Sequence, residues 1–226
     1  MRTSLGFALI GTVVVAAVAV GCSSSGSQQA TGASSGSAAK TQAAGAVEHV
    51  RVALAVPFTA DLPKGWTQTG HAGISVNLVS PQGPYVGVGT DPAPAPGAAE
   101  PMPPRLNAQQ LADWVASRQY LQPTTVVATT FSKFAAWQVD IRLRDDASAT
   151  SRCDGNPQPC VPLIRLPSVT LPLGPSHGAV ARVIFVLLPS GRTMGVVASG
   201  ASADDLDGLL AATQPVLDSI TFDANT

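Results

Sequence analysis

Apolar and polar residues alternate strictly from Trp137 to Arg144. Successive side chains of a strand point to opposite faces of a sheet, so a period of two predicts a strand with one face on a core and one in water. Three shorter stretches follow the same period and predict further half-buried strands: residues 50–56, 74–78 and 85–88.

Two stretches near the C-terminus are more continuously apolar than these. They span 179–188 and 192–198, and Pro189-Ser190-Gly191 separates them. Turn residues between two apolar runs predict a hairpin, and the lack of alternation places it near the centre of the sheet, where both faces are covered.

One helix is predicted to begin after Asn107. Asn107 is a good N-cap, Gln110 stands at the reciprocal position of a capping box, and Leu106 can pack against Leu111. Apolar residues then recur at helical spacing and share a face: Leu111, Trp114 and Val115.

A second helix is predicted near the C-terminus, with Ser202 as its cap and Asp205 three residues later. Pro215 should kink this helix or end its first part, because proline lacks the backbone donor. Together with the aromatic and aliphatic residues of the strands, this helix is expected to complete a single core that includes Trp66, Trp137, Val139, Ile141, Leu206, Leu209, Leu210 and Leu217.

The segment from Asp91 to Pro104 contains six prolines. Such a segment is expected to be extended. We interpret it as a crossover linker in preference to a docking segment for a partner.

The N-terminus has the features of an export signal. A short cationic start, Met1 to Ser4, precedes an uncharged apolar run from Leu5 to Val20. The run ends in Ala19-Val20-Gly21-Cys22, which resembles the bacterial lipobox, with Ala19 where leucine is most frequent. We therefore expect residues 1–21 to be a lipoprotein signal peptide and Cys22 to carry the lipid that anchors the chain outside the plasma membrane. One alternative is a transmembrane anchor, but a spanning helix needs about 20 apolar residues and the run from Leu5 to Val20 is shorter. The other alternative is an ordinary secretory signal.

The residues after Cys22 are almost all small or polar. Ser23 to Gly45 consist mainly of Ser, Gly, Ala, Gln and Thr. This composition cannot bury enough apolar surface to fold, so 22–45 are expected to be the lipidated cysteine and a flexible tether. Residues 46–226 remain, a length that fits a single domain.

Charge gives no indication of a nucleic-acid partner. The chain has 13 Lys+Arg and 14 Asp+Glu, and removal of Arg2 with the signal leaves 12 − 14 = −2. Nucleic-acid binders usually carry a clustered basic face, so we expect none here. The expected partners are the membrane, through Cys22, and an envelope protein or glycolipid.

Cys153 and Cys160 remain once Cys22 is assigned to the lipid. Outside the cytosol an even remainder predicts a disulfide, and Asp154-Gly155-Asn156-Pro157 allows the turn that it needs. A zinc site is disfavoured because no histidine is nearby, and a redox role because the spacing is not Cys-x-x-Cys.

Two segments resemble a known fold family. Phe58 to Trp66 is similar to the strand and "x-Pro-x-Gly-Trp" that open PsbP-like domains, and Leu210 to Phe222 to their final helix and "Ser-Ile/Leu-x-Phe". The chain thus resembles actinobacterial lipoproteins of the LpqN type and, more widely, PsbP-like proteins. The resemblance implies an α+β fold, an antiparallel sheet flanked by helices, and it implies no catalytic residues. The loop between Cys153 and Cys160 departs from the simplest members.

Candidate catalytic and metal-binding patterns are weak. Ser37 to Lys40 fits Ser-x-x-Lys but lies in the tether, and Gly87-Val88-Gly89 lacks the third glycine of a dinucleotide loop and is interpreted as a strand end. The other patterns lack the spacing of a nucleophile with its base or of metal ligands: His49, His71, Ser176-His177 and Asp145-Asp146.

Three functions remain in order of preference. A non-catalytic binding or assembly module fits best, a carrier of a lipid or other apolar ligand comes second, and an unrecognised hydrolase third. No cofactor and no catalytic residue are expected. A cavity would favour the carrier, and a converging Ser, His and acid would favour the hydrolase.

Overall fold

A computed structural model describes nine segments, all in the compact unit that spans 43–226: residues 46–71, 73–96, 101–122, 124–145, 151–152, 159–166, 169–173, 178–200 and 205–223. The predicted signal peptide, Cys22 and the tether lie outside these residues.

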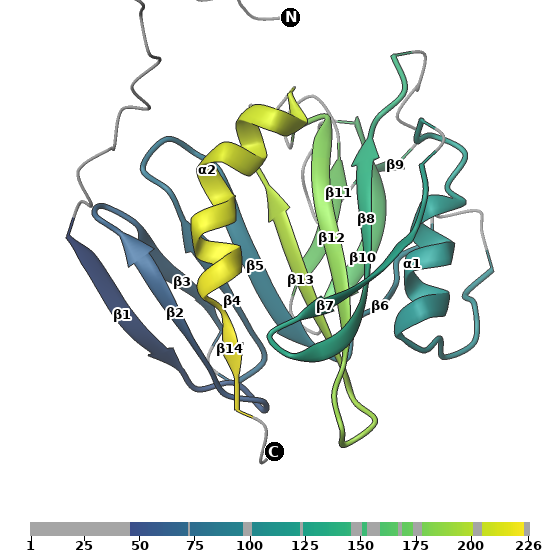
Figure 1. Ribbon diagram of the computed structural model, residues 1–226. Coiled ribbons are helices and arrows are strands. Elements are labelled where there is room, and N and C mark those ends of the chain that lie inside the picture. The colour runs from purple at the N-terminus through teal and green to yellow at the C-terminus, as the bar shows by residue number, and fades with distance from the viewer. Residues whose placement is uncertain are drawn as a thin grey trace, which may run out of the picture. The chain divides into compact units, whose positions relative to one another are not determined.

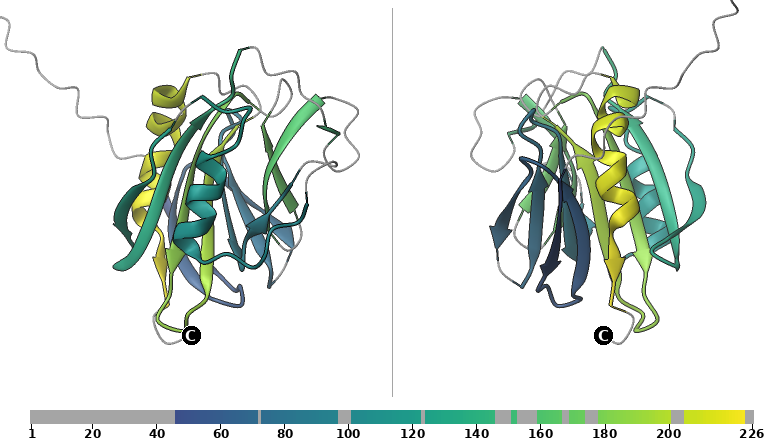
Figure 2. Two further views of the ribbon diagram at one scale, coloured as in Figure 1. Left: turned by 90° about the vertical axis from the view of Figure 1, so that its right-hand side faces the viewer. Right: turned by 60° about the vertical axis from the view of Figure 1, so that its left-hand side comes forward.

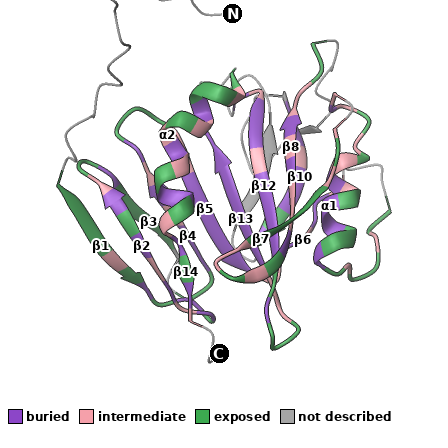
Figure 3. Cartoon of the chain, viewed as in Figure 1, coloured by how far each residue is buried: buried purple, intermediate pink, exposed green. Residues whose placement is uncertain are grey.

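The central element is a seven-stranded antiparallel sheet (Figure 1). Its strands, in spatial order, are β3 (Thr67–His71), β4 (Ser75–Val79), β5 (Tyr85–Thr90), β13 (Thr193–Ser199), β12 (Val180–Leu187), β8 (Phe134–Arg142) and β7 (Val127–Phe131). The period-two segments at 74–78, 85–88 and 137–144 are thus strands, although β8 ends at Arg142. The predicted hairpin forms β12 and β13 and occupies the middle of the sheet, as its continuous apolar pattern indicated (Figure 3).

One face of this sheet is covered by α2 (Leu206–Ser219) and a small three-stranded sheet. The small sheet has the order β1 (Val47–Val52), β2 (Phe58–Pro63) and β14 (Thr221–Phe222). The predicted strand 50–56 ends at Val52, and Leu54 forms only an isolated bridge to Gly73.

The opposite face is covered by α1 (Ala108–Ala116) and by β10 (Pro159–Leu166), as the left view of Figure 2 shows. β10 pairs with β11 (Val169–Leu173), β9 (Ser151–Arg152) and β6 (Ala93–Pro94). The proline-rich segment therefore contributes a short strand, which the linker interpretation missed. The fold is α+β, with antiparallel sheets flanked by helices, as expected.

The hydrophobic residues form two cores, one on each face of the central sheet, so the prediction of a single core was wrong. Trp66 and Leu217 belong to the core under α2, whereas Val139 and Ile141 belong to the core under α1. The central strands are buried on both faces, so alternate side chains of one strand enter different cores. Among the other members predicted, Leu209 is buried, whereas Trp137, Leu206 and Leu210 are half-buried.

The predicted start of α1 is confirmed. Asn107 accepts a hydrogen bond from the Gln110 N–H over 2.9 Å, and the Gln110 side chain accepts one from the Asn107 N–H over 3.0 Å. This closes the capping box and satisfies two backbone donors at the helix start. Leu111, Ala112 and Val115 then pack into the core under α1.

α2 has another N-cap than predicted, and Pro215 does not end it. Its N-cap is Asp205, which accepts from the Gly208 N–H over 2.9 Å, and Ser202 lies outside the described residues. Pro215 stands inside the helix, which continues to Ser219. Val216 and Leu217 are buried in the core, and burying two such side chains stabilises this turn by about 3 kcal/mol or more, comparable to the cost of the proline.

Candidate functional site

A cleft of about 750 Å³ lies on the side of the molecule that carries α1. Its walls are formed by residues 91–94 and 102–104 of the proline-rich segment, the start of α1, β10 and the hairpin of β12 and β13. Its lining consists of Asp91, Pro92, Ala93, Pro94, Met102, Pro103, Pro104, Arg105, Leu106, Asn107, Gln110, Arg165, Leu187, Gly191 and Thr193. Three parts of the chain that are far apart in the sequence therefore build one concave surface: 91–110, Arg165 and 187–193.

An ion pair holds the wall between the proline-rich segment and the hairpin. Arg192 donates from Nη2 to Oδ2 of Asp91 over 2.6 Å, and the Asp91 N–H donates to the Thr193 carbonyl over 2.8 Å. Asp91 has a φ of 48°, a left-handed conformation that aspartate tolerates better than most residues. Arg105 lies farther from the same carboxylate, at 4.0 Å. Asp91 is therefore engaged chiefly with Arg192.

Arg165 brings a second positive charge to the cleft. It lies on β10 opposite Ala93 of β6, and its side chain is exposed. Within the described part of the chain, its guanidinium has no carboxylate partner. The positive charges of Arg105 and Arg165 are therefore less compensated than that of Arg192.

The cleft also exposes apolar side chains. Met102 is 59% exposed and Leu187 is 36% exposed. They are two of the five large apolar side chains exposed in the described segments, and both line the cleft. A surface with arginines at one part and apolar groups at another is suited to an amphiphilic ligand.

Two glycines allow β10 to approach the central sheet beside the cleft. A Cβ at Gly89 would lie 3.0 Å from Cδ1 of Leu166, and one at Gly195 would lie 3.1 Å from Cδ2 of the same leucine. Gly89 belongs to β5, so the interpretation of Gly87-Val88-Gly89 as part of a strand is confirmed. Its role in close packing against β10 could not be recognised before the two strands were seen together.

A second cleft, of about 680 Å³, lies at the other end of α1. Arg118, Arg144 and Asp145 are among its lining residues, and the Arg118 guanidinium lies 4.6 Å from the Trp114 ring centroid, over its face. The described chain stops at Asp145, beside this cleft. We therefore treat the first cleft, which Arg105 and Arg165 line, as the candidate functional site and call it the β10 cleft.

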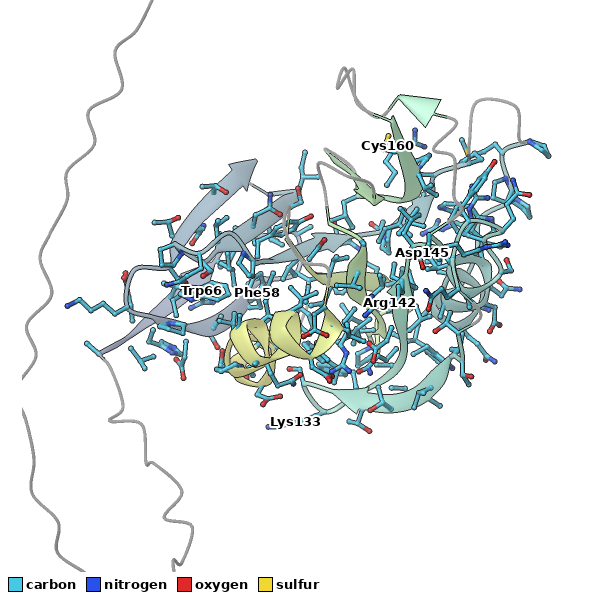
Figure 4. All side chains as sticks on the ribbon, turned by 90° about the horizontal axis from the view of Figure 1, so that it is seen from above. Phe58, Trp66, Lys133, Arg142, Asp145 and Cys160 are labelled. Atoms are coloured by element: carbon cyan, nitrogen blue, oxygen red, sulfur yellow. The ribbon has the colours of Figure 1, made fainter. Side chains whose placement is uncertain are left out.

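The structure describes only one of the two cysteines of the predicted disulfide. Cys160 is fully buried on β10, on the opposite side of the molecule from α2 (Figure 4). Cys153 lies outside the described residues, so the bridge stays a prediction.

Among the residues set aside in the search for chemistry, the two whose side chains the structure describes, His49 and Asp145, do not line the β10 cleft. His49 hydrogen-bonds through Nδ1 to Oδ1 of Asp61 over 2.7 Å, on the exposed surface of the small sheet. Asp145 is exposed. Several candidates lie outside the part that the structure describes: Ser37, Lys40, Asp146, Ser176, His177 and the side chain of His71. No group of three or more His, Cys, Asp and Glu residues that could hold a metal ion occurs among the described residues.

The described residues also include no helix with the length and apolar character needed to cross a membrane.

No family model matches the chain, and no curated protein matches it. Among solved structures, the chain is similar to the cyanobacterial PsbP protein (CyanoP) of Synechocystis sp. PCC 6803 in solution. The match has 11% sequence identity and a TM-score of 0.40, and covers 83% of this chain and 98% of the other. With a TM-score below 0.5, this likeness leaves the PsbP-like family as an expectation from the sequence.

Proposed function

We propose that the chain is an envelope lipoprotein of the actinobacterial LpqN type, held on the outer side of the plasma membrane by lipid on Cys22. Residues 46–226 then serve as a non-catalytic binding or assembly module for another envelope component. The lipobox and the small, polar tether support this address. A flexible tether of residues 23–45 has a root-mean-square reach of roughly 25 Å, which lets the module search close to the bilayer.

The single observation that best supports a binding role is the β10 cleft. It is large enough for a small ligand or the end of a larger one. Among its described lining residues, the ionisable groups are one carboxylate, already paired with Arg192, and the guanidinium groups of Arg105 and Arg165. Guanidinium groups keep their protons at all physiological pH values, so they suit ligand recognition better than proton transfer.

Site-specific photo-crosslinking in the native envelope tests this role. A photo-reactive amino acid replaces Met102 in the full chain, and a second variant carries it at Val127 on β7. Both positions are exposed, at 59% and 52%, and only Met102 lines the cleft. We expect a defined crosslinked species from position 102 that is absent from position 127, identified by mass spectrometry as a lipid or a protein.

The alternatives predict different results. A carrier of an apolar ligand yields lipid in near-equimolar amount on organic extraction of protein purified with its signal. A hydrolase cleaves generic esters and loses that activity with a single Ser→Ala substitution. Absence of any crosslink at position 102, with labelling at 127, contradicts the cleft as the binding site.

A further inference from the structure

We infer that the ligand of the β10 cleft carries a phosphate or carboxylate group bound by Arg165 and Arg105, and an apolar part that lies against Met102 and Leu187. This inference rests on the proposed function only in taking the cleft as the binding site. It adds the chemical class of the ligand, an anionic amphiphile.

The charges of the described lining are unbalanced in favour of an anion. Asp91 is the one carboxylate among the described lining residues, and its closest cation is Arg192, at 2.6 Å, compared with 4.0 Å for Arg105. Among the residues that the structure describes, the two arginines that line the cleft, Arg105 and Arg165, thus have little or no compensating charge. The planar, five-donor guanidinium matches a carboxylate or phosphate in two parallel hydrogen bonds.

The start of α1 forms part of the cleft wall. Asn107 and Gln110 line the cleft, and their reciprocal bonds use the N–H groups of these two residues. The N–H groups of Ala108 and Gln109, in the first turn between them, have no carbonyl partner within the helix. The positive end of a helix dipole favours an anion, and Asn107 and Gln110 at the start of α1 line the cleft together with the two arginines.

The apolar part of the ligand follows from the exposed Met102 and Leu187. Leu187 is the last residue of β12, and its Cα partner is Thr193, which also lines the cleft. Covering these side chains removes apolar area from water and is favourable. A purely inorganic anion would leave both exposed, so the lining as a whole fits an amphiphile better.

Calorimetric titration of three matched probes tests this inference. The full chain is reconstituted in neutral phosphatidylcholine nanodiscs and titrated with hexyl phosphate, hexan-1-ol and inorganic phosphate. Empty nanodiscs give the background. We expect hexyl phosphate to bind more tightly than either of the other probes, because it alone presents both the anion and the apolar chain.

Substitutions separate the two halves of the site. Arg165→Gln should weaken hexyl phosphate binding about tenfold, the loss expected for a charge-assisted hydrogen bond. Leu187→Ser should weaken hexyl phosphate severalfold and leave inorganic phosphate unchanged. The matched control is Arg51→Gln, which removes an exposed arginine outside the cleft and should change nothing.

Each contrary result has a definite meaning. Hexyl phosphate that binds no better than hexan-1-ol, or equally to Arg165→Gln and Arg51→Gln, overturns the anionic half. Inorganic phosphate that binds as tightly as hexyl phosphate overturns the apolar half and indicates a site for free phosphate. A crosslinked ligand at position 102 together with failure of all three probes overturns this inference and leaves the proposed function standing.

Discussion

Arg182 on β12 and Asp140 on β8 form a doubly hydrogen-bonded ion pair across the central sheet. Nε and Nη2 of the arginine donate to Oδ1 and Oδ2 of the aspartate, each over 2.7 Å, and the two residues are direct partners in the strand register. Arg182 also donates to Oε1 of Gln214 over 3.1 Å, so this pair ties the sheet to α2. Their side chains are only 16% and 31% exposed.

Replacing Asp140 should therefore destabilise the fold. Asp140→Asn removes the charge that pairs with a mostly buried guanidinium, and we expect the free energy of unfolding in urea to fall by about 2 kcal/mol. Arg51→Gln breaks a 3.9 Å ion pair in which the arginine is 73% exposed, so it should cost well under 1 kcal/mol. Equal losses in the two variants would contradict a structural role for the pair.

Strand β8, which carries Asp140, shows what the sequence can predict. The alternation from Trp137 to Ile141 indicated a strand with a buried face, and Val139 and Ile141 are fully buried. The alternation did not reveal that the polar face would be partly covered as well, because Gln214 of α2 reaches Arg182 from 32 positions away. Local pattern sets the strand, and non-local packing sets the environment of its two faces.

The β10 cleft was beyond sequence prediction for a similar reason. Its arginines stand at positions 105 and 165, and the pairing of β6 with β10 brings them to one surface. That pairing involves only two residues of β6, in a segment with the composition of a linker. The capping box of α1, in contrast, is a local motif, and it was predicted residue by residue.

Asn107→Ala should destabilise the protein through α1 alone. The substitution removes the side chain that accepts from the Gln110 N–H, and loss of such a cap typically costs about 1 kcal/mol. Urea unfolding followed by circular dichroism measures the loss. Asn107→Asp retains the acceptor and serves as the control, so a loss of equal size in both variants would show that the cap is not the cause.

Lipidation at Cys22 predicts that the native protein partitions into a detergent phase and incorporates a fatty-acid probe. Cys22→Ala removes the thiol that receives the lipid, so labelling should disappear while the remaining sequence is unchanged. Cys160→Ala, at another of the three cysteines, serves as the control and should retain the label. Undiminished labelling of Cys22→Ala would rule out the anchor.

A Cys153–Cys160 bridge would close a short loop at the start of β10. Chain-entropy reasoning gives such a loop about 2–3 kcal/mol of stabilisation at most. Non-reducing mass spectrometry of protein isolated from the envelope should find one bond that joins the two peptides. Two alkylatable thiols at these positions would show that the prediction is wrong.

Tyr85 should titrate later in the folded chain than in the unfolded one. Burial raises the pKa of its phenol above the ordinary value of 10.0, and the side chain of Ser199, its partner on β13, offsets part of this increase. The folded state therefore holds the proton at pH values where the unfolded state has lost it. Stability from the neutral phenol is fully present below pH 10 and falls as the pH rises from there toward the folded pKa.

Tyr120→Phe isolates this titration, because the chain has only two tyrosines. Tyrosinate absorbance of this variant should rise at higher pH in buffer than in concentrated urea. Below pH 10 the free energies of unfolding of Tyr85→Phe and of the parent chain should differ by a constant amount. Above pH 10 the free energy of unfolding of the parent should fall relative to that of the variant. The slope is at most about 1.4 kcal/mol per pH unit, the limit for one proton. Coincident absorbance midpoints in buffer and urea would mean that the Tyr85 hydroxyl is solvated in the folded protein.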